Sequence, residues 1–437
     1  MRFYTAAPSA AVSGAITVPG DKSVSHRSLM LAGIATGISE VSGFLPSEDC
    51  LASMAAMRAL GVRIEQPGAT QVRVHGVGLR GLHGAPQALD MGNSGTAMRL
   101  FTGLLAAQDF DSRLIGDASL MKRPMERVAA PLRAMGADVR TSGGTPPVDI
   151  RGGAALHGIV YRMPVASAQV KSAILLAGLY AEGVTTVISP AVSRDHSERM
   201  LSSFGADVQV DALTVRVRPP QRLDAQHLQV PGDFSSAAFF IVAGLLGASP
   251  EGLLIRNVGI NPTRTGLLDI LRLMGAKIEV QDARHSGAEP VADLLVRRSD
   301  LLGIEVPKAL VPLAIDEFPV LFIAAACAGG ETRISGAEEL RVKESDRIAV
   351  MSAGLRALGV AHETLPDGMH IAGRGNGLAF SGGQVDSGGD HRVAMSFSVA
   401  SLRATGPIVI RDVANVATSF PGYVELAQAA GLDLHEA

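Results

Sequence analysis

The sequence contains no tryptophan and only four tyrosines among its 437 residues. Proteins commonly hold unpaired bases by stacking them on aromatic side chains, so this composition argues against a nucleic-acid-binding surface. The charge is nearly balanced as well, because 39 lysines and arginines face 42 aspartates and glutamates. Without a basic excess there is little to attract a polyanion. We therefore expect no nucleic-acid partner.

Cysteine and long apolar runs are scarce too. The two cysteines, Cys50 and Cys327, fit neither a disulfide framework nor a metal-ligand spacing, so we expect a reducing compartment and no metal. An apolar run such as 237–246 is too short, and too rich in small residues, to cross a bilayer. Residues 1–4 lead into a strand-like segment without the basic and apolar regions of a signal peptide. These features predict a cytoplasmic protein with no membrane partner.

One phrase recurs along the chain, as in Ala59-Leu60-Gly61-Val62, and its glycines are 69–84 residues apart. They are Gly61, Gly136, Gly205, Gly275, Gly359 and Gly431. Each follows an amphipathic helical pattern, and the first five precede strand-like alternation, which is typical of glycine at a helix C-terminus. The chain is therefore expected to be an α/β (α+β) protein of six repeated units, each of about seventy residues.

The segment 15–28, AITVPGDKSVSHRS, predicts a strand, a tight turn and a helix. The candidate helix caps are Asp21, Ser23 and Ser25. Arg27 follows Ser23 by four residues, on the same helix face and beside Lys22. Because a helix N-terminus carries unpaired N–H groups and partial positive charge, this arrangement favours an anion such as phosphate. An ordinary capped helix with solvated charges explains the segment equally well when it is taken alone.

Five further segments repeat this pattern of an extended piece, a polar turn and a helix rich in small apolar residues. They begin at Asp90, Met163, Val230, Ile315 and Val385. Their helices are apolar nearly all round, with charges gathered at the N-terminal ends. Buried helices with charged starts are unusual unless those ends meet in a cleft. Six such ends would form an anion trap.

The repeats also predict two domains. Val230-Pro-Gly-Asp resembles Val18-Pro-Gly-Asp, so both segments are candidate crossing points between domains. We expect the first strand to join the last units, which gives one domain of residues 1–19 plus 233–437 and a second of 20–232. Each domain then holds three units, with the active site in the cleft between them.

Together, six motifs identify the family that this chain resembles. They are PGDKSVSHR from Pro19, GNSGTAMR from Gly92, KRPMERV from Lys122, SAQVKSA from Ser167, RVKESDR from Arg341 and DHR from Asp390. In this order they resemble the enolpyruvyl transferases over the whole chain, and most closely those that act on shikimate 3-phosphate. RDHSE from Arg194 and NPTR from Asn261 resemble the class II branch. The resemblance implies a two-domain inside-out α/β barrel with buried helices and βαβαββ-type units, and a monomer without a cofactor.

The resemblance further implies two substrates, phosphoenolpyruvate and shikimate 3-phosphate, in the pathway to chorismate and the aromatic amino acids. Both carry a phosphate and a carboxylate, so their site needs several cations and no obligatory metal. The matched positions for shikimate 3-phosphate are Lys22, Ser23, Arg27, Ser167, Gln169, Arg194, Asp316 and Lys343. Those for phosphoenolpyruvate are Lys22, Asn93, Gly95, Arg123, Gln169, Arg347 and Arg392.

Three residues carry the expected chemistry. Transfer of the enolpyruvyl group needs a base for the attacking hydroxyl and a proton for the vinyl methylene. We assign the base to Asp316 and the proton transfer to Glu344, which we place on one helix with Lys343 and Arg347. Lys22 is expected to assist. The alternatives are a capping role for Asp316 and a solvated, salt-bridged helix face for 341–347.

The sequence departs from the family pattern at three positions. Thr418 stands where class I members carry a lysine that contacts phosphoenolpyruvate, and Glu339 replaces an asparagine of the class I motif. Gly95 is glycine where glyphosate-insensitive members carry alanine, so we expect this chain to be a glyphosate target. The rival readings are a transferase acting on UDP-N-acetylglucosamine, an RNA 3'-phosphate cyclase and a non-catalytic anion binder.

Overall fold

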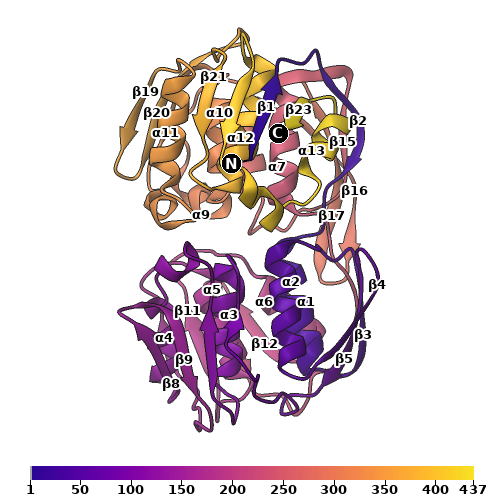
Figure 1. Cartoon of the computed structure of the whole chain (residues 1–437), viewed down its shortest axis with the longest axis vertical. Helices are drawn as coiled ribbons and strands as arrows, with labels where there is room; N and C mark the ends of the chain where they lie inside the picture. Colours follow the sequence, from indigo (N-terminus) through magenta and orange to yellow (C-terminus); the bar gives the residue numbers. More distant parts are fainter. Residues whose placement is uncertain (1) are drawn as a thin grey trace. The chain divides into compact units, whose positions relative to one another are not determined.

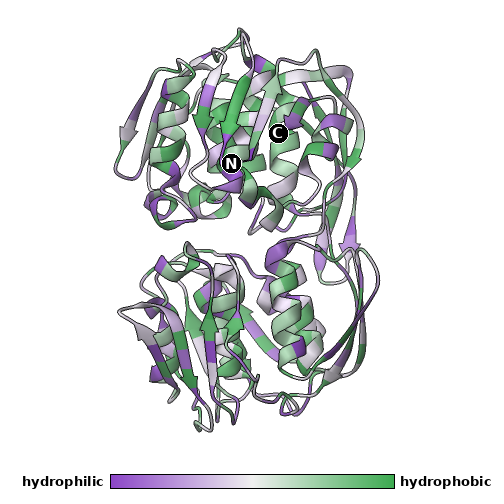
Figure 2. Ribbon diagram, in the orientation of Figure 1, coloured by the Kyte–Doolittle hydropathy of each residue, from purple (hydrophilic) through white to green (hydrophobic). Residues whose placement is uncertain are grey.

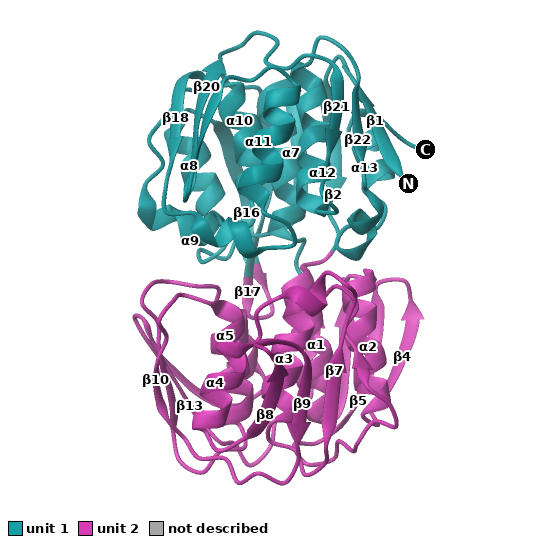
Figure 3. Ribbon diagram, turned by 60° about the vertical axis from the view of Figure 1, so that its left-hand side comes forward, with its two compact units in different colours: residues 1–19, 231–284, 290–437 teal, residues 20–230, 285–289 magenta. Residues whose placement is uncertain are grey.

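The computed structural model describes residues 2–437 and divides the chain into two compact units (Figure 3). The first unit comprises Met1–Pro19, Pro231–Arg284 and Pro290–Ala437, and the second comprises Gly20–Val230 and His285–Glu289. The chain therefore changes unit within both Val-Pro-Gly-Asp segments, and again at the tip of one hairpin. We expect each unit to be a folding domain with the limits given by the repeats, and this stays a prediction.

The second unit contains three copies of one module, in which a helix, a strand, a second helix and a two-stranded hairpin follow one another. The first copy is α1 (Lys22–Ile34), β3 (Thr36–Ser42), α2 (Glu48–Ala59), β4 (Arg63–Gly68) and β5 (Gln71–Val77). The second is α3 (Gly95–Leu105), β7 (Ser112–Ile115), α4 (Glu126–Ala134), β8 (Asp138–Ser142) and β9 (Thr145–Arg151). The third is α5 (Ala168–Gly178), β11 (Thr185–Ile188), α6 (His196–Ser203), β12 (Asp207–Asp211) and β13 (Thr214–Arg218).

The first unit repeats the module three more times. Its first copy is α7 (Phe234–Gly247), β15 (Ala248–Gly259), α8 (Gly266–Leu273), β16 (Lys277–Ser286) and β17 (Glu289–Arg297). The next is α10 (Phe318–Ala326), β18 (Gly329–Ile334), α11 (Arg347–Ala357), β19 (His362–Leu365) and β20 (Gly368–Arg374). The last is α12 (His391–Ala400), β22 (Ile408–Arg411), α13 (Tyr423–Ala429) and β23 (Asp433–Glu436), completed by β1 (Phe3–Ala7). The first and last strands, β1 and β23, thus pair in one sheet (Figure 1).

Among residues 2–437, five of the six sheets share one topology, and the sixth, β18-β20-β19, has only three strands. In those five a short strand pairs in parallel with the first strand of the module, and the hairpin adds antiparallel strands beyond it. The short strands are β2 (Val12–Thr17), β6 (Leu89–Asp90), β10 (Val160–Arg162), β14 (His227–Gln229) and β21 (Gly383–Asp386). Two sheet orders show the pattern, β14-β3-β5-β4 and β21-β22-β1-β23. The register pairs Ser39 with Val74 and Thr5 with Val409.

The helices that begin each module form the core of their unit, as the sequence predicts. In α1 every residue from Val24 to Ile34 is buried, and in α7 every residue from Phe234 to Leu246 is buried. Figure 2 shows the interior of the first unit as mostly hydrophobic where α7, α10 and α12 lie. Small residues permit this close packing: a Cβ added to Gly103 in α3 would lie 2.2 Å from the carbonyl oxygen of Ala173 in α5.

The six repeated glycines close their helices as expected. Each takes a positive φ, between 77° and 105°, directly after α2, α4, α6, α8, α11 or α13. Such angles favour glycine because a Cβ would clash with the backbone. Within residues 2–437, no helix combines the length and apolar character that a membrane span requires.

Candidate active site

The first helix begins as the opening segment predicts. Asp21 is its cap and accepts a hydrogen bond from the backbone nitrogen of Val24 at 2.9 Å. Lys22 stands in the first turn, partly exposed, with its Nζ 2.9 Å from Oδ2 of Asp49 in α2. Ser23 lies beside it, also partly exposed. The helix start therefore offers an anion an accessible ammonium group and the partial positive charge of a helix N-terminus.

Arg27 is buried one turn further along this helix. Its guanidinium donates to Ser197 Oγ at 2.7 Å, to Ser172 Oγ at 2.8 Å and to the Ser23 carbonyl at 3.0 Å, all uncharged oxygens. Burial lowers the pKa of Arg27 to about 10, while the nearby charges of Glu198 and Asp21 oppose that shift and the charge of Arg194 adds to it. The guanidinium is thus held by neutral oxygens, in a site where burial disfavours its charge and an anionic ligand would stabilise it.

A second cationic group of this unit surrounds the start of α3. Arg99 donates to Gln169 Oε1 at 2.5 Å and to the Pro124 carbonyl at 3.1 Å, while Gln169 Nε2 donates to Thr96 Oγ1 at 2.9 Å. A Cβ placed on Gly95 would lie 2.7 Å from Arg123 Nη1, so that guanidinium is against the helix start. The structure therefore brings Gly95, Arg123 and Gln169 together.

Three further predicted residues of this unit stand at other turns. Asn93 Nδ2 donates to Asp117 Oδ2 at 2.7 Å, just before α3. Ser167 caps α5 by accepting a hydrogen bond from the nitrogen of Val170. Arg194 is half-buried in the turn before α6, close enough to Arg27 to influence its pKa.

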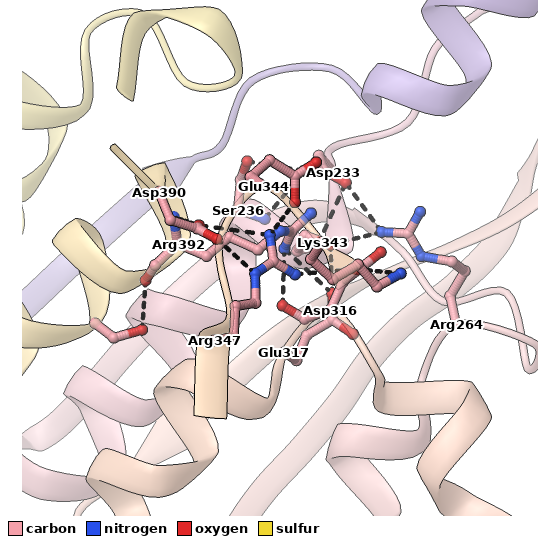
Figure 4. A network of polar contacts seen from close by, with 12 residues as sticks. Asp233, Ser236, Arg264, Asp316, Glu317, Lys343, Glu344, Arg347, Asp390 and Arg392 are labelled. Atoms are coloured by element: carbon pink, nitrogen blue, oxygen red, sulfur yellow. Dashed lines mark hydrogen bonds and ion pairs between the residues drawn. The ribbon is translucent and has the colours of Figure 1, made fainter. Parts of the chain in front are cut away.

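In the first unit the predicted residues converge on Arg347, whose side chain is 1% exposed (Figure 4). Its guanidinium lies 2.8 Å from Asp390 Oδ2, 2.7 Å from Glu344 Oε2 and 3.3 Å from Asp316 Oδ1. Lys343 Nζ is 3.5 Å from the same Asp316 oxygen. One buried cation therefore contacts three carboxylates beside an ammonium group.

This clustering sets the protonation states of its members. Burial lowers the pKa of Arg347, but the carboxylates of Asp390 and Glu344 outweigh it and raise that pKa above the ordinary value. For Asp390 burial raises the pKa, and the charge of Arg347 outweighs it, so the pKa is lowered. Burial lowers the pKa of Lys343, and Asp316 opposes that shift.

Arg392 completes the predicted set. It follows Asp390, which caps α12 by accepting a hydrogen bond from the Arg392 nitrogen at 2.9 Å. Arg392 Nη1 donates to the Asp316 carbonyl at 3.1 Å. Asp316, Lys343, Glu344, Arg347 and Arg392 are thus neighbours in one unit, although they are up to 76 residues apart in sequence.

The chain matches a sequence model described as EPSP synthase (3-phosphoshikimate 1-carboxyvinyltransferase) over residues 6–426. This range includes the predicted site residues of both units. The chain belongs to the EPSP synthase family.

Relatives of this family match the chain over nearly its full length. A protein from Methylococcus capsulatus named 3-phosphoshikimate 1-carboxyvinyltransferase is 59% identical, covering 99% of this chain and 98% of its own. One of the same name from Acidithiobacillus ferrooxidans is 55% identical over 100% of both chains.

Solved structures agree. An EPSP synthase from Acinetobacter baumannii has a TM-score of 0.90 at 52% identity and covers 100% of both chains. The enolpyruvyl transferase NikO from Streptomyces tendae has a TM-score of 0.80 at 18% identity, which shows the fold alone. The predicted fold class and family are confirmed.

One local prediction for this EPSP synthase family member was wrong, and two alternatives fail. Glu344 does not share a helix with Lys343 and Arg347: α11 begins at Arg347, because Asp346 caps it and accepts from the nitrogen of Ala349 at 3.0 Å. The alternative of a solvated helix face fails with it, since Arg347 is buried.

Asp316 is not a helix cap either. Glu317 occupies the cap position of α10 and makes no capping bond with its side chain. The carboxylate of Asp316 is thus left to contact Lys343 and Arg347.

Several buried polar residues next to the predicted ones were not among the site residues expected from the sequence. In the second unit Lys171 and Glu198 form a buried ion pair at 2.5 Å, and His196 Nδ1 lies 2.7 Å from Glu289 Oε1. Most of them stand inside quoted motifs, SAQVKSA and RDHSE, next to assigned residues, and that adjacency was the available signal. In the first unit the missed carboxylates include Asp390, within the DHR motif, and Glu317, next to Asp316.

The positions that depart from the class I pattern have local partners. Thr418 is 6% exposed and its hydroxyl donates to the Asn415 carbonyl at 2.7 Å. Glu339 lies in a short 3₁₀ turn, Glu338–Val342, and its charge opposes the lowering of the Lys343 pKa. Both cysteines are buried and free.

Proposed function

We propose that this chain transfers the enolpyruvyl (1-carboxyvinyl) group of phosphoenolpyruvate to the 5-hydroxyl of shikimate 3-phosphate, releasing phosphate. The names of its full-length relatives support this substrate pair. The observation that carries the chemistry is the contact of Arg347 with three carboxylates next to Lys343. Acid–base groups held against fixed cations are what a proton-transferring site requires.

Each substrate has its own set of residues in the proposal. Shikimate 3-phosphate is bound by Lys22, Ser23, Arg27, Ser167, Gln169, Arg194, Asp316 and Lys343. Phosphoenolpyruvate is bound by Lys22, Asn93, Gly95, Arg123, Gln169, Arg347 and Arg392. Since both sets draw on both units, the proposal requires the two units to contribute to one site. The protein then acts as a cytoplasmic monomer and needs no cofactor.

The reaction proceeds by addition and elimination. Asp316 takes the proton of the 5-hydroxyl, whose oxygen forms a bond to C2 of phosphoenolpyruvate, while Glu344 protonates the methylene carbon and makes it a methyl group. In the tetrahedral intermediate Glu344 removes a methyl proton, the C2–O bond to phosphate breaks, and the double bond returns. The proton held by Asp316 passes to the departing phosphate, which restores both carboxyl groups to their starting states. Lys22 and the arginines stabilise the departing phosphate, with Lys22 also assisting proton transfer.

A phosphate-release assay tests the proposal. Purified protein is supplied with phosphoenolpyruvate and either shikimate 3-phosphate or UDP-N-acetylglucosamine, and the organic product is identified by mass. We expect release only with shikimate 3-phosphate. Release with the nucleotide sugar would favour the rival transferase, and release with neither acceptor would contradict enolpyruvyl transfer.

A further inference from the structure

Beyond the residues assigned above, a buried chain of polar contacts leads from Arg264 to Arg392 (Figure 4). Arg264 Nη2 donates to Ser235 Oγ at 2.8 Å, and Ser235 Oγ in turn donates to Glu317 Oε1. The same Glu317 oxygen lies 3.7 Å from Arg392 Nη1. These contacts join α7, the turn before α8, the start of α10 and the start of α12.

Burial makes this chain of contacts sensitive to each member. The side chains of Arg264 and Glu317 are 3% and 1% exposed, and that of Arg392 is 10% exposed. Charges taken out of water to this extent depend on their partners, so removal of one reduces the compensation that the next receives. Arg264 also lies 3.3 Å from Asp233 Oδ1, which makes the charges alternate along the chain.

The direction of the hydrogen bonds matters as well. An arginine can only donate, so Ser235 must accept from Arg264 and is left to direct its own hydroxyl hydrogen at Glu317. Successive hydrogen bonds of this kind polarise one another. Arg264 thereby fixes the carboxylate of Glu317, and that carboxylate attracts the guanidinium of Arg392.

The motif NPTR from Asn261 folds so that Arg264 is presented to Ser235. Asn261 Oδ1 accepts from the nitrogen of Thr263 at 2.9 Å, and the Asn261 carbonyl accepts from the nitrogen of Arg264 at 2.8 Å. Capping of α7 does not explain the arginine, because Asp233 already caps that helix through Ser235 and Ser236. The motif thus has a local fold but, so far, no functional role.

We propose that Arg264 and Glu317 are positioning residues that hold Arg392 for phosphoenolpyruvate. This inference rests on the proposed function, in which Arg392 contacts that substrate. Arg392 has a second acceptor in the Asp316 carbonyl, the neighbour of Glu317, so a shift of Glu317 tilts the guanidinium rather than releasing it. The affinity for phosphoenolpyruvate should therefore depend on Arg264, while the affinity for shikimate 3-phosphate should not.

The test compares Arg264→Lys, Ser235→Ala and Glu317→Gln with wild type by steady-state kinetics for both substrates. Hydrogen bonds to buried charged groups set the scale, so we expect the KM for phosphoenolpyruvate to rise about 10-fold or more, and the KM for shikimate 3-phosphate to change by less than about 2-fold. Glu317→Gln combined with Arg392→Lys should raise the KM little beyond Arg392→Lys alone, because both act through one contact.

Arg403→Lys is the matched control. Arg403 is a buried arginine of the same unit, 8% exposed, which donates to the Asn376 carbonyl at 2.9 Å. It should lower the melting temperature without changing either KM. Ser235→Ala removes one hydroxyl and serves as the decisive variant if Arg264→Lys fails to fold.

Two failures can be told apart. Wild type that does not turn over the substrate pair contradicts the proposed function and this inference with it. An active wild type whose folded variants raise both KM values equally, or leave that for phosphoenolpyruvate within 2-fold, overturns the positioning role alone.

Discussion

Arg27 and Arg347 are both buried arginines near the start of a helix, but the two units surround them differently. Arg27 is held by two serine hydroxyls and a carbonyl. Arg347 is held by three carboxylates. Accordingly the pKa of Arg27 is lowered to about 10, with burial as the main cause, whereas the pKa of Arg347 is raised.

The difference indicates two roles, anchoring of a phosphate and proton transfer. A cation fixed by neutral dipoles keeps its charge for a ligand, so the group around Arg27 is suited to anchoring phosphate. A cation surrounded by carboxylates shares its charge between them and a ligand such as phosphoenolpyruvate, and it also keeps those carboxylates in place for proton transfer. On the proposed assignment, the second unit supplies mainly binding groups, and the first unit adds the proton-transferring carboxylates to its own binding groups.

The strongest test of this comparison removes the proton-transferring groups. Glu344→Gln and Asp316→Ala should each lower kcat by about 10²–10⁴-fold, because each removes general acid–base catalysis. Binding of at least one substrate should persist, since neither change removes a cation. Single-turnover kinetics and calorimetry measure the two quantities. Glu338→Gln, an exposed neighbour, is the control, and near-normal kcat in either variant would remove that residue from the mechanism.

The next test replaces each arginine by methionine and follows the free energy of unfolding. Arg347→Met leaves three carboxylates without their shared cation and should cost about 3–5 kcal/mol. Arg27→Met removes hydrogen bonds to two hydroxyls and a carbonyl and should cost less, about 1–3 kcal/mol. Its effect should also appear as loss of shikimate 3-phosphate binding, about 2–5 kcal/mol. Equal losses of stability in denaturant titrations would erase the distinction between the units.

Much of this arrangement could be predicted from sequence, because helix starts carry local signals. Asp21 caps α1, and the repeated glycines close the helices that they follow. The position of Glu344 could not be derived so simply. Lys343–Arg347 fits a charged helix face by spacing, and only the cap at Asp346 excludes the residues before Arg347 from the helix.

The partners of the arginines lay further beyond prediction. Asp390 is 43 residues from Arg347, and Ser197 is 170 residues from Arg27, so tertiary packing alone brings them together. Serine also gives a weak signal, since most serines are solvated or cap a helix. Whether a buried arginine meets hydroxyls or carboxylates is therefore a property of the packed unit.

A smaller effect concerns how the stability of the second unit depends on pH through His26. His26 is buried in α1, where Nδ1 lies 2.8 Å from Ser53 Oγ and Nε2 lies 3.3 Å from Ser94 Oγ. Burial, and then the charges of Lys22 and Arg27, lower its pKa from 6.5 to about 3.

The sign follows from proton uptake. Between pH 3 and 6.5 the unfolded chain binds a proton at His26 that the folded chain does not, so stability falls as the pH falls through this window. One such proton contributes a slope of up to about 1.4 kcal/mol per pH unit. Denaturant titrations at several pH values should show a shallower slope for His26→Gln than for wild type, whereas His435→Gln, at an exposed site, should not differ. An unchanged slope in His26→Gln would mean that the histidine is protonated when folded.

The smallest expected effect is on the KM for phosphoenolpyruvate, when Gly95 of the second unit is replaced by alanine. A Cβ at Gly95 would lie 2.7 Å from Arg123 Nη1 and 3.0 Å from Arg99 Nη1, so Gly95→Ala must displace the end of at least one flexible side chain. Because neutral groups hold Arg99, a shift of a few tenths of an ångström should be inexpensive, and the KM for phosphoenolpyruvate should rise by about 10-fold or less. Glyphosate is longer than the substrate that it imitates and needs the same space, so its inhibition constant should rise by a larger factor. Competitive inhibition measured against phosphoenolpyruvate gives both constants. Thr96→Ser is the control. Gly92→Ala is unsuitable, because Gly92 has a φ of 55°, at which any residue with a Cβ would be strained. If wild type tolerates millimolar glyphosate, or if Gly95→Ala changes neither constant, then the steric role given to Gly95 is wrong.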